Sequence, residues 1–243
     1  MADTAGVFEA TKETLTEFVR SLPESDLARP VPATPDWTVQ DVVAHLAGDV
    51  ARVIVGDFPM AFFSAFGEDQ AVGPLNDWTA GMVEERRGRS LDELLAEWDA
   101  GCVTLLAMMR GETPWPDNVP MFADRVLVTD LGVHLHDLYG AFGIQRDRDG
   151  APVKLGLSGY IATIGWRLAT DGVPALRIVA DKEWVVGEGE PGATVGSSRW
   201  ELFRAASGRR SVEQLRGFQW DGDPEPYIRY FYPYGIRTEA LVE

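Results

Sequence analysis

Apolar residues recur at spacings of three, four and seven along the first 145 residues, with polar residues between them, which is the pattern of amphipathic helices. We expect four long helices, at residues 4–22, 38–56, 90–109 and 121–142. A shorter helix is expected between the second and third of these, at residues 75–85. Thr38 is a suitable N-cap for the second helix, and Ser90 with Glu93 forms a capping box before the 90–109 helix. Four long helices in one segment favour an antiparallel bundle.

The pattern changes after a polar, charged stretch at 144–150, which is typical of an exposed linker. Beyond it we expect a helix, two alternating strands, a short strand and a further helix, at residues 151–170, 175–187, 193–195 and 198–206. The chain is therefore predicted to have an α+β fold. Residues 1–145 form the four-helix bundle, and residues 151–243 form a small α+β domain.

Composition and charge limit the kinds of molecule that the protein is expected to bind. Apolar residues make up 45% of the chain and charged residues 25%, which is typical of globular proteins. The 22 basic and 38 acidic residues give a net charge of −16, which repels nucleic acid and anionic membrane surfaces. No apolar run approaches the roughly 20 residues that span a bilayer, and the N-terminus lacks a signal-peptide pattern. We expect a cytoplasmic monomer or homodimer that binds small molecules.

The single cysteine, Cys102, excludes an internal disulfide. It lies within a helical apolar pattern, which favours a buried structural thiol over a nucleophile.

All three histidines, His45, His134 and His136, fall in the predicted bundle helices. Asp130 and His134 are four residues apart, about 40° around a helix, so both side chains can reach one metal ion. His45 on a facing helix can supply the third ligand and leave one coordination position open, as catalytic sites require. An Asp and a His at this spacing also form an ordinary helix pair, so a packing role remains open.

Two further acidic residues lie near these positions in the helical projection. Asp137 falls within about 20° of Asp130, whereas His136 is displaced by about 240° and faces elsewhere. Asp41, one turn before His45, either orients the imidazole or stabilises the first turn of its helix.

The motif Trp37-Thr-Val-Gln-Asp41-Val-Val-Ala-His45-Leu46, followed by Asp130-x-x-x-His134-x-x-Asp137, resembles the mycothiol-dependent maleylpyruvate isomerase family. The N-terminal domain of that family is a DinB-like four-helix bundle. Gly208-Arg-Arg-Ser211, Trp220-Asp-Gly-Asp223 and Ala240-Leu-Val-Glu243 are similar to its smaller α+β domain, so the resemblance covers nearly the whole chain.

The resemblance implies that His45, Asp130 and His134 bind a divalent metal, usually zinc, with Asp130 where the family usually has the longer Glu. His136 and Asp137 are then expected beside the bound cofactor, His136 as a wall of the site or a packed residue rather than a ligand. The metal would bind mycothiol or a similar thiol and generate a thiolate that adds to a small electrophile. The outcome is either isomerisation through a reversible adduct or transfer of the thiol.

Arg209 and Arg210 are predicted to hold a carboxylate of the substrate or the thiol. Two other functions use the same fold. One is a non-catalytic, metal-stabilised binding or regulatory module, and the other is a hydrolase with a zinc-bound water.

Overall fold

The structure is a computed structural model that describes residues 3–65 and 69–243. The chain divides into two compact units. The first comprises the residues up to Ala65, Gly73–Gln145 and Glu243, and the second comprises a short stretch ending at Val72 together with Arg146–Val242. Each unit is described by itself below.

The first 145 residues are mainly helical. Their α-helices are α1 (Thr4–Arg20), α2 (Val39–Val53), α3 (Met60–Ser64), α4 (Asp69–Glu84), α5 (Leu91–Met109) and α6 (Ala123–Ala141). A short 3-10 helix, η1 (Glu24–Asp26), and a two-stranded sheet of β1 (Pro30–Val31) and β2 (Thr34–Thr38) connect α1 to α2.

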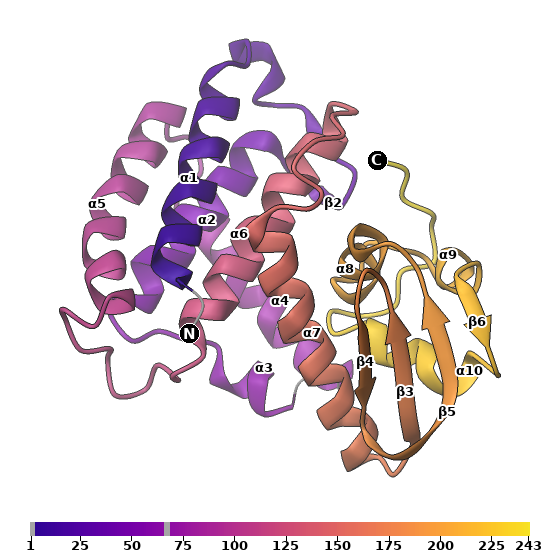
Figure 1. Cartoon of the computed structure of the whole chain (residues 1–243). Coiled ribbons are helices and arrows are strands. Elements are labelled where there is room, and N and C mark those ends of the chain that lie inside the picture. The colour runs from indigo at the N-terminus through magenta and orange to yellow at the C-terminus, as the bar shows by residue number, and fades with distance from the viewer. Residues whose placement is uncertain (1–2, 66–68) are drawn as a thin grey trace. The chain divides into compact units, whose positions relative to one another are not determined.

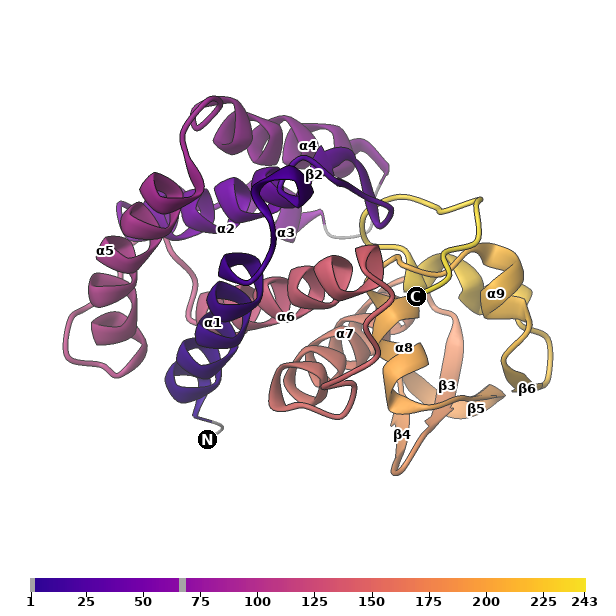
Figure 2. The ribbon, with the colours of Figure 1, turned by 90° about the horizontal axis from the view of Figure 1, so that it is seen from above.

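The four long helices α1, α2, α5 and α6 form the predicted bundle (Figures 1 and 2). Both α1 and α2 pack against α5 and against α6. The apolar positions of the helical pattern are the ones buried in this core, among them Leu15 in α1, Val43 in α2, Leu95 in α5 and Leu131 in α6. Each large apolar side chain that is fully buried contributes about 1.5–3 kcal/mol, so this shared core holds the four helices together.

Helix α6 is buried on nearly all sides in its second half. Every residue from Leu131 to Tyr139 is buried. The helix therefore places polar side chains inside the protein on more than one of its faces, His134 and His136 among them.

The connection between α2 and α5 differs from the prediction. It contains α3, which the sequence pattern did not predict, and α4 starts at Asp69 rather than at Leu75. Proline ordinarily ends or starts a helix, but in the structure α4 continues through Pro74.

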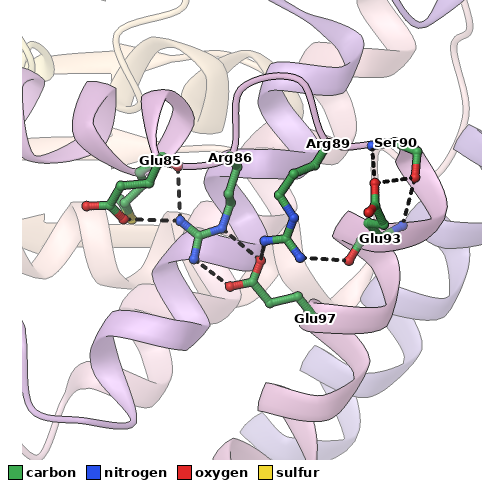
Figure 3. A network of polar contacts seen from close by, with 7 residues as sticks. Glu85, Arg86, Arg89, Ser90, Glu93 and Glu97 are labelled. Carbon is green, nitrogen blue, oxygen red and sulfur yellow. Dashed lines mark hydrogen bonds and ion pairs between the residues drawn. The ribbon is translucent and has the colours of Figure 1, made fainter.

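The corner between α4 and α5 is held by charged side chains (Figure 3). Arg86 is only 6% exposed, and its guanidinium donates to both carboxylate oxygens of Glu97, at 3.0 and 2.7 Å. Its remaining nitrogen donates to the backbone oxygen of Met82 at 3.0 Å, and Arg89 donates to the same Glu97 carboxylate. Glu97 thus neutralises a buried cation and joins the turn to α5.

Replacing Glu97 with Ala is expected to destabilise the protein by about 2 kcal/mol. Loss of one partner of a buried ion pair costs about 3–5 kcal/mol, and we reduce this because the Glu97 side chain is 26% exposed. The expected fall in Tm is about 4–8 °C. Glu84→Ala is the control, since its pair with Arg87 is exposed and worth at most about 1 kcal/mol. Equal denaturation midpoints for the two variants would contradict the prediction.

The second unit contains the predicted helix at 151–170 as α7 (Ala151–Thr170) and a four-stranded sheet of order β4-β3-β5-β6. Its strands are β3 (Pro174–Val179), β4 (Glu183–Val186), β5 (Glu188–Gly196) and β6 (Gln219–Asp221). Antiparallel pairing of β3 with β4 sets Ile178 opposite Trp184, and parallel pairing with β5 sets Ile178 opposite Val195. Helix α7 packs against β3, β4 and β5 (Figure 1).

The predicted helix at 198–206 is α8 (Arg199–Ala206), with Ser198 as its N-cap, and it packs on α7. The remaining elements are short: α9 (Val212–Arg216), α10 (Glu225–Ile228) and the 3-10 helix η2 (Arg229–Phe231). The α+β fold class, with a helical bundle before a small sheet domain, is confirmed. Among the described residues, no helix combines the length and apolar character needed to cross a membrane.

Candidate metal centre

The start of α2 is fixed by a capping box. The Thr38 hydroxyl accepts a hydrogen bond from the Asp41 backbone N–H at 3.2 Å, and the Asp41 carboxylate accepts from the Thr38 backbone N–H at 2.9 Å. Asp41 therefore stabilises the helix start, which is the second of its two predicted roles. His45 follows one turn later and is 3% exposed.

Three predicted ligands from two helices meet in the core of the bundle. One donor atom each from His45, Asp130 and His134 lies within 4.8 Å of the others. His45 Nε2 is 3.3 Å from Asp130 Oδ2, and His134 Nε2 is 3.6 Å from Asp130 Oδ1. Two donors that bind a four-coordinate zinc ion at about 2.1 Å are about 3.4 Å apart, so the carboxylate and the two imidazoles fit a divalent ion.

Burial differs among the three candidate ligands. His134 is 4% exposed, similar to His45, whereas the side chain of Asp130 is 31% exposed. Burial raises the pKa of the Asp130 carboxyl, but His134, His45 and a hydrogen bond from Asp49 outweigh it and hold that pKa below its ordinary value. The carboxylate is thus ionised near neutral pH. Because the Asp130 side chain is partly exposed, the site is open to solvent at this residue.

Asp137 lies behind His134 rather than beside the donor atoms. It is fully buried, and its Oδ2 is 3.0 Å from His134 Nδ1. Histidine ligands commonly direct their second ring nitrogen to a carboxylate, which fixes the ring orientation and leaves Nε2 for the metal.

Trp37 covers the two imidazoles. It lies in β2, and the centroid of its indole is 4.8 Å from that of His45 and 5.9 Å from that of His134. The two histidine rings are 4.9 Å apart and nearly perpendicular. This aromatic contact limits the rotation of both rings on one side of the site.

The sequence analysis missed Asp49, which lies one turn after His45 in α2. Its Oδ2 is 3.5 Å from His45 Nε2, and its side chain is hydrogen-bonded to Asp130. Burial raises the pKa of Asp49 well above its ordinary value; His45 opposes this, and the nearby Asp130 adds to it. The signal in the sequence was its spacing of four from His45, the same spacing that links Asp130 to His134.

The other predicted residues lie elsewhere in the two units. His136 packs with its ring 5.7 Å from that of Tyr139, on a different face of α6 from His134. In the second unit, Arg210 is buried and donates to both carboxylate oxygens of Glu201, at 2.6 and 3.0 Å, while Arg209 donates to the backbone oxygen of Ser207 at 2.7 Å.

Cys102 is buried, as expected for a structural thiol. Burial raises its pKa to about 12, so it is not a nucleophile near neutral pH.

Residues 8–139 match the sequence profile of a protein family described as the mycothiol maleylpyruvate isomerase N-terminal domain. Two crystal structures are similar in fold, one of the mycothiol-dependent maleylpyruvate isomerase and one of a histidine-to-alanine mutant of it. Each is 14% identical and covers 90% of this chain and 91% of its own, with TM-scores of 0.56 and 0.55. No curated protein sequence matches the chain.

Proposed function

The chain belongs to the family of the mycothiol maleylpyruvate isomerase N-terminal domain, and from that membership we propose that it is a metal-dependent enzyme that uses a low-molecular-weight thiol. The thiol is mycothiol or a similar molecule, and the substrate is a small electrophile. The observation that carries the proposal is the convergence of His45, Asp130 and His134 within 4.8 Å of one another inside the bundle. The reaction is isomerisation through a reversible adduct or transfer of the thiol to the electrophile.

The donor set suits this chemistry. A divalent ion bound there, with zinc the first candidate, lowers the pKa of a thiol that binds to it and so supplies a thiolate near neutral pH. The protein then needs no cysteine nucleophile, in agreement with the buried Cys102.

Each side chain around the donors has a defined task. His45 and His134 would hold the ion through Nε2, and Asp130 would hold it through its carboxylate, whose side chain is 31% exposed. Asp137 Oδ2 lies 3.0 Å from His134 Nδ1, and a carboxylate at this position favours the tautomer that leaves Nε2 free to bind a metal. Trp37 packs against both imidazoles and excludes water from that side.

The predicted roles of His136 and Asp137 beside the cofactor, and of Arg209 and Arg210 in holding a carboxylate, stay predictions. The ion pair of Arg210 with Glu201 fixes its guanidinium inside the second unit. A carboxylate ligand would have to share or replace that partner.

The proposal is tested with protein that carries no polyhistidine tag and is reconstituted with zinc. Maleylpyruvate, the substrate in the name of the structural relatives, is incubated with the protein in the presence and absence of mycothiol. We expect isomerisation that requires both the thiol and the metal, with metal-stripped protein as the inactive control. Hydrolysis of a substrate without thiol would indicate a zinc-water hydrolase instead. Thiol binding without turnover of maleylpyruvate or other electrophiles would indicate a binding module.

A further inference from the structure

The solvent-accessible side of the candidate metal centre continues along helix α6 as an apolar surface. Around the helix axis, Val126 lies about 40° from Asp130, and Phe122 lies about 80° from it in the same direction. His134 lies about 40° in the opposite direction and is buried. Val126 is half-buried and Phe122 is 43% exposed. The exposed part of the Asp130 side chain is therefore on the same side of α6 as these two apolar residues.

Two further aromatic rings extend this surface across the bundle. Phe58 lies between α2 and α3, and its ring stacks on that of Phe63 in α3 with 5.1 Å between centroids. The ring of Phe122 lies 6.3 Å from that of Phe58 and 5.7 Å from that of Phe63. We call Val126, Phe122, Phe58 and Phe63 the apolar strip. Single exposed apolar side chains are common, but apolar residues in contact with one another at a surface often line a ligand site.

The dimensions of the apolar strip suit one arm of a small molecule. Each helical residue advances about 1.5 Å, so Val126 and Phe122 lie about 6 and 12 Å from Asp130 along the α6 axis. A molecule that has one end at the metal centre and extends along α6 would meet Val126 first and the aromatic rings next. The net charge of −16 repels an anionic arm. The arm that fits is a neutral alkyl or aryl chain.

We propose that the apolar strip selects the substrate, and that the preferred electrophile carries a neutral alkyl or aryl arm that lies along Val126 toward Phe122. This inference rests on the proposed function, because it places the reactive end of the substrate at His45, Asp130 and His134. It adds the substrate class: an electrophile with an apolar arm, in place of a compact and wholly polar one. Each methylene that leaves water for such a surface strengthens binding about fourfold.

The test measures the binding of acetohydroxamate and octanohydroxamate to zinc-loaded protein without a polyhistidine tag, by titration calorimetry. The two probes carry the same metal-binding group and differ in the alkyl tail, so the ratio of their Kd values reports the contribution of the tail. No thiol and no turnover are needed.

Three variants are compared with the wild type. Phe122→Ser removes a ring of the apolar strip but leaves a preferred residue at the N-cap of α6. Val126→Thr keeps a β-branched side chain and places a hydroxyl on the surface. Met121→Ser is the matched control, because Met121 is the neighbour of Phe122, is 100% exposed and is outside the apolar strip.

In the wild type we expect octanohydroxamate to bind at least about thirtyfold more tightly than acetohydroxamate. Phe122→Ser should reduce this ratio at least about fivefold and Val126→Thr at least about threefold, while acetohydroxamate binds all four proteins equally. Met121→Ser should keep the wild-type ratio. Thermal melts check that the variants are folded; if Phe122→Ser is not, Val126→Thr carries the test.

Equal affinities of the two hydroxamates in the wild type would overturn the inference and leave the proposed function intact. An unchanged ratio in the folded variants, or an equal loss in Met121→Ser, would do the same, because the tail would then bind elsewhere. Zinc-loaded wild type that binds neither hydroxamate would also overturn the inference. Wild-type protein that takes up no zinc would overturn the proposed function with it.

Discussion

His45→Ala and His134→Ala are each expected to lose the bound metal and thiol-dependent turnover. Removing a side chain that only supports a ligand costs about 10–100-fold in metal affinity, so removing a ligand itself should cost more than about 100-fold. His45 Nε2 and His134 Nε2 lie 3.3 and 3.6 Å from the Asp130 carboxylate, and the third histidine, His136, packs on Tyr139 instead and cannot replace either of them. Metal content per chain and turnover should therefore fall together.

His136→Gln is the matched control for these variants. It removes the third histidine of the chain, which packs against Tyr139 on a different face of α6. We expect it to retain close to one ion per chain, measured by plasma mass spectrometry on protein without a polyhistidine tag. If His45→Ala retained its metal while His136→Gln lost it, the assignment of the ligands would be wrong.

Removal of the metal is expected to lower Tm by about 5–10 °C. An ion that binds only the folded state, at a free concentration of about 100 times its Kd, adds about 2.7 kcal/mol of stability. One kcal/mol corresponds to about 2–4 °C for a chain of this size. The physical source is the neutralisation of the Asp130 carboxylate, which lies against the buried Asp49.

The measurement is a thermal melt of wild-type protein with zinc and after dialysis against a chelator. His45→Ala serves as its control and should melt at the same temperature in both conditions, because it lacks a site for the ion to stabilise. An unchanged Tm in the wild-type protein would show that the folded state does not bind zinc more tightly than the unfolded state.

The bundle and the grouping of His45, Asp130 and His134 could be predicted because both follow from helical periodicity. Apolar residues at spacings of three and four define the buried face of each helix, and the same periodicity places Asp130 and His134 on one face. The packing of α2 against α6 then brings His45 to them, which the concentration of histidines in the predicted helices had indicated.

The neighbours of the triad were harder to predict because they depend on tertiary burial. Asp41 and Asp49 are both four residues from His45, and only the structure shows that the first caps α2 while the second is buried beside Asp130. Trp37 reaches the imidazoles because β2 ends where α2 begins, and this short hairpin lies in a proline-rich stretch without strand periodicity.

Short elements in the second unit were missed for a related reason. Helices α9 and α10 have five and four residues, too few for a helical period to be recognised. Strand β6 has three residues and is defined by its pairing with β5, which no local pattern records.

The capping box at the start of α2 makes the length of the segment from Thr38 to His45 as important as its composition. Thr38 fixes where the helix begins, and each residue after it turns the chain by about 100° and advances it by about 1.5 Å. An insertion or deletion of a single residue between them would preserve a helix and its apolar character, yet it would turn the imidazole away from Asp130. Homologues that keep the site should therefore vary in sequence along this segment while keeping the same number of residues between the N-cap and the histidine.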